Sequence, residues 1–270
     1  MTRAVTLALP LTAVAAALLA VATAAWAETP EEAGLRIAKE ADAYDAGFGD
    51  SVADGTMILR NKAGKESVRE FEARTLEMAD DGDKSINLFK EPRDVKGTAV
   101  LTFTHRSGDD DQWLYLPALK RTKRISSSNK SGSYMGSEFS YEDLGSPEVE
   151  KYTYKYLKDE PCPGGDGLTC FVMERYPTDK GSGYTRQIVW QEKETYRAYK
   201  VDYYDRKDAF LKTLTFEDYK KYLDKHWRPG KMLMVNHQTG KSTVMTWANY
   251  QFQSGLREAD FNANRLKSLR

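Results

Sequence analysis

A long series of strand-like runs is the feature that most constrains how this chain folds. Short runs that alternate or are rich in β-branched and aromatic residues recur from residue 56 to residue 252, separated by turn signals such as K-A-G and D-D-G-D. No helical pattern lies between successive runs, as a parallel sheet would require. The sequence therefore predicts a mainly β fold of about eleven antiparallel strands. Besides the stretch that begins at Trp113, the runs lie at residues 57–60, 67–78, 84–90, 98–105, 152–156, 170–175, 184–192, 198–204, 211–219, 232–237 and 242–252.

Helical signals occur at the two ends of the strand series. T-P-E-E at residues 29–32 combines a capping Thr, a Pro at the first helical position and a Glu that completes a capping box. Apolar residues then recur at helical spacing, which predicts an amphipathic helix to about Tyr44, ended by Gly47 and Gly49. Residues 256–269 predict a short closing helix with Phe261 and Leu266 directed inward.

The first 27 residues have the organisation of a secretory signal peptide. Arg3 supplies the positive charge, residues 4–23 the apolar core, and A-W-A at residues 25–27 the cleavage pattern. A single transmembrane anchor is the alternative, because the apolar core is long for a signal peptide. We expect cleavage near Ala27, leaving residues 28–270 as one soluble periplasmic domain. No Cys follows the cleavage pattern to carry a lipid anchor.

The charge balance argues against a nucleic-acid partner. The chain has 40 basic and 40 acidic residues, and removal of Arg3 leaves 39 against 40. A nucleic-acid binder is expected to be clearly basic.

The two cysteines predict a disulfide. Cys162 and Cys170 flank the turn in P-C-P-G-G-D-G-L-T-C, between two strand-like runs. An exported compartment permits a disulfide that closes the long turn of a hairpin. A redox role would favour a C-x-x-C motif, which is absent.

No motif for catalysis, metal binding or a cofactor stands out. His105, His226 and His237 are far apart, and no G-x-S-x-G elbow is present. S-G-D-D-D at residues 107–111 lacks the ligand spacing of an EF-hand and is interpreted as a turn. G-K-S at residues 240–242 lacks the preceding glycine of a phosphate loop. Carboxylates are plentiful, but none is singled out as a glycosidase acid or base. We therefore expect no metal, cofactor or catalytic residue.

Residues 113–143 combine an apolar run, a basic cluster and a Ser/Gly-rich segment. Pro117 cannot donate to a β-ladder and places the end or edge of a strand there. The large apolar groups of this stretch are candidates for ligand contact: Trp113, Tyr115, Leu116, Leu119, Tyr134, Met135, Phe139 and Tyr141. Of these, Tyr134, Met135 and Phe139 are either the inner side of a mobile lid or ordinary core. The basic cluster is either a charged strand edge or a surface that contacts a partner or a lipid headgroup, and consists of Lys120, Arg121, Lys123 and Arg124.

These residues carry a family resemblance. W-L-Y-L-P-A-L-K-R at 113–121 and I-S-S-S-N-K-S-G-S-Y-M-G-S-E-F-S-Y-E-D-L at 125–144 resemble the bacterial outer membrane lipoprotein-sorting protein group, and the likeness extends from residue 53 to residue 261. That group is similar to the periplasmic carrier LolA and is associated with exporters of the RND and MMPL type. The resemblance implies an unclosed antiparallel β-barrel wrapped over a few helices, with an apolar cavity for acyl chains. No lid-locking residue of the carrier is carried over to this sequence.

The sequence thus favours a non-catalytic periplasmic carrier of a lipid or lipidated molecule. The resemblance implies lipid or lipoprotein acyl chains as cargo, an RND/MMPL inner-membrane transporter as a partner, and an outer-membrane acceptor. Two alternatives stay open at this point. One is an accessory docking module of an exporter with a filled core, and the other is an envelope hydrolase that uses carboxylates on its concave face.

Overall fold

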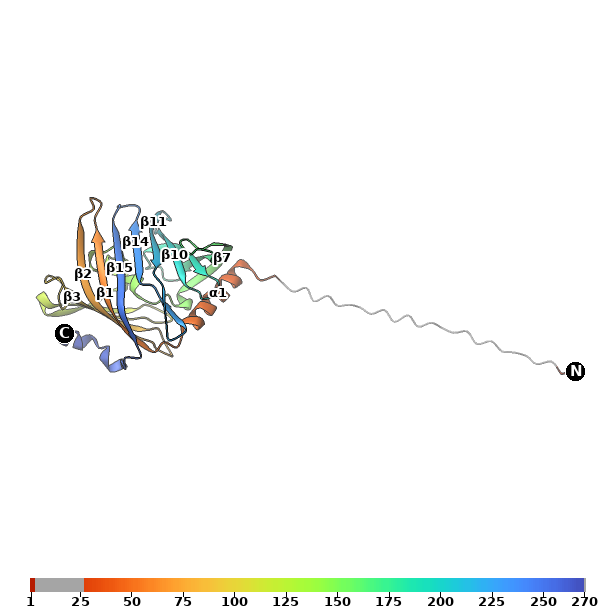
Figure 1. Cartoon of the computed structure of the whole chain (residues 1–270), viewed down its shortest axis with the longest axis horizontal. Helices are drawn as coiled ribbons and strands as arrows, with labels where there is room; N and C mark the ends of the chain where they lie inside the picture. Colours follow the sequence, from red (N-terminus) through yellow and green to blue (C-terminus); the bar gives the residue numbers. More distant parts are fainter. Residues whose placement is uncertain (3–26, 270) are drawn as a thin grey trace.

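The computed structural model describes residues 1–2 and 27–269 (Figure 1). The predicted signal peptide lies almost entirely outside these residues. Among the helices that the structure describes, none has the length and apolar content that a membrane crossing requires.

Thirteen strands form one large antiparallel sheet, in the order β6-β5-β4-β3-β2-β1-β15-β14-β11-β10-β9-β8-β7. Since β6 and β7 are its two ends and do not pair with each other, the sheet is unclosed, and the predicted fold class is confirmed. Two further strands, β12 and β13, form a separate hairpin. The strands are β1 (Asp50–Arg60), β2 (Glu66–Leu76), β3 (Lys84–Glu91), β4 (Ala99–Phe103), β5 (Asp111–Leu116), β6 (Arg121–Ile125), β7 (Tyr152–Pro161), β8 (Thr169–Pro177), β9 (Tyr184–Glu192), β10 (Ala198–Asp205), β11 (Phe210–Glu217), β12 (Lys220–Tyr222), β13 (His226–Arg228), β14 (Lys231–Asn236) and β15 (Ser242–Phe252).

Three of these strands were not predicted from the sequence. β6 contains three of the four residues of the basic cluster, and β12 and β13 are three residues each. Short, charged strands lack the apolar alternation on which the sequence prediction relies. The expected break at Pro117 is confirmed, because β5 ends at Leu116 and a 3₁₀ turn, η1 (Pro117–Leu119), follows.

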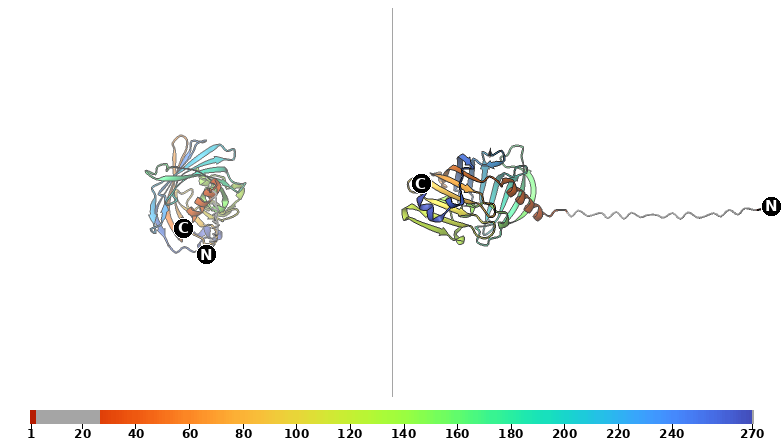
Figure 2. Two further views of the ribbon diagram at one scale, coloured as in Figure 1. Left: turned by 90° about the vertical axis from the view of Figure 1, so that its right-hand side faces the viewer. Right: turned by 90° about the horizontal axis from the view of Figure 1, so that it is seen from below.

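Helix α1 (Pro30–Asp45) lies inside the curve of the sheet (Figure 2). Its predicted capping box is confirmed: the Thr29 hydroxyl accepts from the Glu32 amide at 3.2 Å, and the Glu32 carboxylate accepts from the Thr29 amide at 2.9 Å. The helix packs on β7 so closely that a Cβ added to Gly34 would lie 2.9 Å from the Lys155 amide nitrogen. Glycine at this position therefore permits the helix to lie directly on the edge strand.

Strands β3 to β5 are buried on both faces. Phe89, Val100 and Leu114 belong to the main core on the concave face. Ile86, Leu88 and Leu101 belong to a second cluster on the opposite, convex face, which the C-terminal segment covers through Phe261 and Leu266.

The C-terminal segment differs from the predicted closing helix. It forms two 3₁₀ turns, η6 (Glu258–Asp260) and η7 (Ala263–Ser268), because Phe261 between them has φ −99° and ψ 80°, outside the helical region. The inward positions of Phe261 and Leu266 are confirmed, as they are 4% and 1% exposed.

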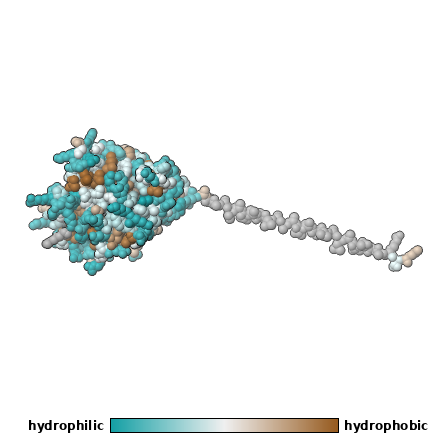
Figure 3. Space-filling view, in the orientation of Figure 1, coloured by the Kyte–Doolittle hydropathy of each residue, from teal (hydrophilic) through white to brown (hydrophobic). Residues whose placement is uncertain are grey.

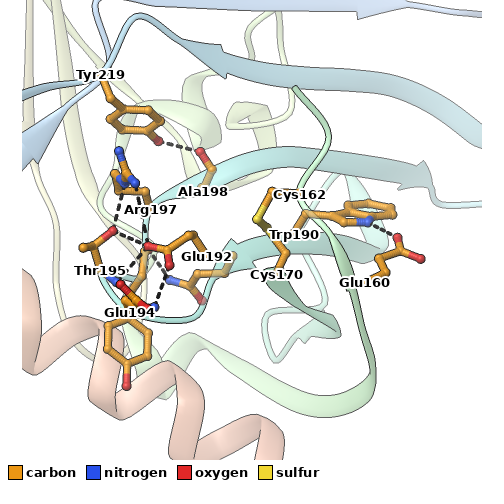
Figure 4. Close-up of a disulfide and its surroundings, with 12 residues drawn as sticks. Glu160, Cys162, Cys170, Trp190, Glu192, Glu194, Thr195, Arg197, Ala198 and Tyr219 are labelled. Atoms are coloured by element: carbon orange, nitrogen blue, oxygen red, sulfur yellow. Dashed lines mark hydrogen bonds and ion pairs between the residues drawn. A yellow bond between two sulfur atoms is a disulfide. The ribbon is translucent and has the colours of Figure 1, made fainter. Parts of the chain in front are cut away.

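The predicted disulfide is confirmed. Cys162 and Cys170 are bonded with their Cα atoms 5.0 Å apart, at the turn between β7 and β8 (Figure 4). The bond packs against Tyr199 in a small cluster of its own, with Leu168 and Trp190 at its edge.

Removing this bond should destabilise the fold through loop entropy. Loss of a cross-link with a sequence separation of 8 predicts a drop of roughly 2–3 kcal/mol in the free energy of unfolding for the double variant Cys162→Ala/Cys170→Ala. Urea denaturation of the oxidised proteins measures the difference, and the wild type unfolded with a reducing agent serves as the matched control. A change below about 0.5 kcal/mol would contradict the prediction.

Candidate functional site

A cavity of about 1160 Å³ lies on the concave side of the sheet. The inner faces of the central strands form its floor, and the second half of α1 and residues 142–152 form its cover. Protein interiors are close-packed and contain few voids larger than a water molecule. A space of this size is therefore a feature of the fold rather than a packing defect.

The floor of the cavity is an apolar stripe that crosses neighbouring strands. Val189 on β9 pairs with Val201 on β10, which pairs in turn with Leu214 on β11. Phe216 pairs with Met232 on β14 in the same way. Because residues at directly paired positions point to the same face of an antiparallel sheet, all five side chains face the cavity.

Methionines continue this stripe toward the centre of the sheet. Met232 pairs with Met245 on β15, and Met245 pairs with Met57 on β1. Met57 and Met245 are buried in the core, whereas Met232 lines the cavity. Methionine side chains are unbranched and adapt to irregular shapes, so this part of the wall suits a flexible apolar ligand.

Residues 126–143, which begin with the Ser/Gly-rich run, form a segment that lies beside the cavity and fills the adjoining part of the concave face. Its Tyr134 and Phe139 are 1% and 2% exposed, and Tyr134 packs against Phe89 with ring centroids 6.0 Å apart. Gln112 on β5 donates to the carbonyl of Tyr141 at 2.8 Å, and Thr243 on β15 accepts from the Glu138 amide at 3.0 Å. Hydrogen bonds to strands on both sides therefore hold the segment in place.

A buried ion pair completes this attachment. The Lys212 Nζ on β11 lies 2.7 Å from the Asp143 carboxylate, with the two side chains 4% and 5% exposed. Lys212 also donates to the Glu138 carbonyl at 2.9 Å, and Tyr184 donates to Asp143 at 2.9 Å. Burial and the Asp143 charge raise the pKa of Tyr184 well above its usual value. Lys212 thus links Asp143 and the Glu138 carbonyl to β11.

One end of the cavity is acidic. Burial, followed by the charge of Glu77, raises the pKa of Asp83 to about 6. Burial, followed by the charges of Asp83 and Asp42, raises the pKa of Glu148 to about 7. Both carboxyl groups therefore favour their neutral form more than a carboxyl in water does.

The cavity wall also carries arginines among aromatic rings. Arg197 lies over Trp227 at 4.3 Å. It also lies near Tyr219 at 5.5 Å, and its Nε donates to the Thr195 hydroxyl at 2.8 Å (Figure 4). Arg228 pairs with Asp45 at 2.7 Å. The cavity wall therefore carries basic as well as acidic side chains.

The predicted ligand contacts lie around the cavity rather than in its wall. None of the eight is among the residues that line it: Trp113, Tyr115, Leu116, Leu119, Tyr134, Met135, Phe139 and Tyr141. Trp113 and Tyr115 point to the convex face and pack in the second cluster, and Leu119 is 60% exposed. Tyr134 and Phe139 belong to the main core, with Met135 and Tyr141 packed against it. Contact of these eight residues with a ligand stays a prediction.

The basic cluster lies at one end of the sheet. Arg121, Lys123 and Arg124 are exposed on the edge strand β6, and Lys120 immediately precedes them. Arg124 forms an ion pair with Asp111. The cluster is thus far in the strand order from β9 to β11, and its partner or headgroup role stays a prediction.

Sequence reasoning did not identify the residues that do line the cavity. The signal was the alternation along the later strands, where Val201 and Tyr203 on β10 and Leu214 and Phe216 on β11 share one face. The sequence analysis used these strands only to count elements. Across residues 27–269, no group of three or more His, Cys, Asp or Glu residues converges as metal ligands.

The open antiparallel sheet curved around a helix is a LolA-like fold. The LolA superfamily protein NE2245 from Nitrosomonas europaea has this fold, with a TM-score of 0.67 at 19% identity over 85% of this chain and 97% of that one.

Structures with higher sequence identity show the family to which the chain belongs. A domain from Vibrio parahaemolyticus described as an outer membrane lipoprotein-sorting protein domain is 57% identical, with a TM-score of 0.85 over 88% of this chain and 99% of that one. A DUF1329 family protein from Desulfovibrio piger is 33% identical, with a TM-score of 0.82 and the same coverage. A family model described as "Uncharacterized protein" matches residues 81–268. No curated protein matches the sequence. The chain belongs to this family of outer membrane lipoprotein-sorting and DUF1329 proteins.

Breaking the buried ion pair should cost far more than breaking an exposed one. Lys212→Met leaves Asp143 buried and unpaired, so we expect the free energy of unfolding to fall by about 3–5 kcal/mol. Lys231 forms an ion pair of the same length with Glu217, but these two side chains are 34% and 44% exposed. Lys231→Met should therefore cost less than about 1 kcal/mol. Equal losses in urea denaturation would show that Lys212 and Asp143 do not hold the segment.

Proposed function

We propose that this protein is a carrier that binds a lipid or a lipidated molecule in the cavity on its concave face. The single observation that carries the proposal is the cavity itself, about 1160 Å³ in volume with an apolar floor. Small-molecule sites usually measure about 300–1000 Å³, so this space suits a ligand at the upper end of that range or beyond. The binding domain comprises residues 28–270, after removal of the predicted signal peptide.

The energetics of acyl chains support a carrier. A chain of about sixteen carbons leaving water is worth on the order of 11 kcal/mol, at roughly 0.8 kcal/mol for each buried methylene. Such a chain does not cross an aqueous compartment unshielded at a useful rate. The stripe formed by Val189, Val201 and Leu214 offers the apolar surface that replaces the membrane.

The proposed setting is the periplasm. The neighbour from Vibrio parahaemolyticus is described as a lipoprotein-sorting domain, and the disulfide is suited to an oxidising compartment. We propose that the carrier passes its cargo to or from an RND/MMPL-type transporter of the inner membrane or an acceptor at the outer membrane. The basic cluster on β6 would contact that partner or anionic headgroups.

The cavity also distinguishes the carrier hypothesis from the alternative of a docking module. A module that only binds an exporter has no need of an interior space, and its core would be filled. Extraction of the purified native protein with organic solvent, followed by mass spectrometry, tests the difference. Stoichiometric lipid supports a carrier, whereas no lipid, together with no uptake of a fluorescent fatty acid, would favour the docking module.

Filling the cavity from the helix should reduce lipid binding. Ala41 lines the cavity, whereas Ala43 on the same helix is exposed and does not. Ala41→Trp should lower the affinity for a fluorescent fatty acid by at least roughly tenfold, because the indole occupies the space that the chain would take. Ala43→Trp makes the same change in side chain and should leave the affinity unchanged. Fluorescence titration measures both, and equal affinities would place the ligand elsewhere.

Charge reversal tests the basic cluster. Arg121→Glu/Lys123→Glu should weaken binding to phosphatidylglycerol vesicles at least roughly tenfold, since each basic residue near an anionic surface is worth about 1 kcal/mol. The control Lys220→Glu/Lys221→Glu makes the same change on the exposed strand β12. Sedimentation with vesicles measures the effect. An unchanged affinity, or an equal loss in the control, would reduce the cluster to a charged strand edge.

A further inference from the structure

Glu148 is a buried carboxylic acid at the acidic end of the cavity. The residue is 8% exposed and lines the cavity. Among the described residues, no hydrogen bond or ion pair engages its carboxylate, whose oxygens are open to the cavity and not shut off from solvent. Buried charged groups are normally paired, because an unpaired charge loses its hydration without compensation. A carboxyl that faces an open space without a partner among the described residues is accessible to a cation from outside the chain.

Carboxyl groups from two other elements face the same end. Asp42 comes from α1, and Asp83 comes from the loop between β2 and β3. Asp42 and Asp83 both act on Glu148 electrostatically and make it harder to ionise. The residues from the three elements thus create a negative potential in the cavity once they are ionised.

The cations near this end do not neutralise it. Lys151 is engaged by Asp110 in an ion pair, and Arg106 is exposed. Both lower the pKa of Glu148, but burial and the two neighbouring carboxylates outweigh them. Glu77 and Asp45 add further negative charge around Asp83.

We propose that the Asp83 and Glu148 end of the cavity binds the ammonium group of an amine-bearing lipid, whose acyl chains lie along the apolar floor. The inference rests on the proposed carrier function and names the class of headgroup. An ammonium group has three donors and a full positive charge, which are what an unpaired carboxylate requires. A bare metal ion fits less well, since the described residues bring no three such ligands together for coordination. A headgroup held at this end places its tail toward Val189 and Val201.

Binding of an ammonium requires ionised carboxylates, so it depends on pH. With pKa values of about 6 for Asp83 and about 7 for Glu148, both groups are largely charged at pH 8 and largely neutral at pH 5. The affinity for an amine-bearing lipid should therefore fall as the pH falls through this range. A lipid without an amine should not follow this profile.

The experiment compares two lipids with identical acyl chains, both fluorescently labelled on the chain. Phosphatidylethanolamine carries the ammonium, and phosphatidylglycerol does not. At pH 8 the full mature protein should bind phosphatidylethanolamine about tenfold more tightly. Glu148→Gln should remove this preference by lowering the affinity for phosphatidylethanolamine, and should not lower the affinity for phosphatidylglycerol. Glu70→Gln, on an exposed position of β2 that does not line the cavity, is the matched control and should behave as the wild type.

The outcomes separate this inference from the carrier function. Equal binding of the two lipids by the wild type, or a preference for phosphatidylglycerol, would overturn the ammonium site while leaving a carrier. Binding of neither lipid would instead overturn the carrier proposal. The wild-type pH profile needs no variant, so the test holds even where Glu148→Gln does not fold. A profile that is the same for both lipids would also contradict the ammonium site.

Discussion

An unclosed sheet has a concave face that the rest of the chain must cover, and this requirement governs the whole structure. Thirteen strands curve without closing, so apolar side chains on the inner face cannot be covered by an opposite strand. Helix α1 and residues 126–151 supply the cover instead. One core cluster includes buried residues from β1 to β4 and from β8 to β11. The cavity lies against residues of β1, β2 and β8 to β11, so the packed core and the cavity share the same concave face.

Polar contacts fix the position of the segment that covers the sheet, whereas apolar contacts only favour its burial. Tyr134 and Phe139 would be buried by many arrangements of their segment. The Lys212 and Asp143 ion pair permits few arrangements of the segment, because a buried charge without its partner costs several kcal/mol. The face of the molecule seen in Figure 3 is largely hydrophilic, with small apolar patches.

The sequence predicted the elements better than the site. Alternation indicated the antiparallel strands, T-P-E-E indicated α1, and the spacing of Cys162 and Cys170 indicated the disulfide. The orientation of Trp113 and Tyr115 was not predictable in this way, because W-L-Y-L is apolar at every position. Both faces of β5 are buried, so parity carries no information there. The cavity wall joins residues from 38 to 250, and no local pattern marks residues that only the closed topology brings together.

The distribution of charge bears on how a carrier releases its cargo. Moving an acyl chain from water into the cavity is strongly favourable, but moving it from the cavity into a membrane exchanges one apolar surface for another. The acyl chain therefore contributes little to the direction of transfer, and the headgroup contributes much more. In this fold the floor is apolar and adaptable, while fixed and titratable charges lie elsewhere in the cavity wall. In the proposed carrier, affinity and direction would rest on different residues, so that a partner acting at the charged groups could shift the equilibrium without disturbing the strands proposed to hold the tail.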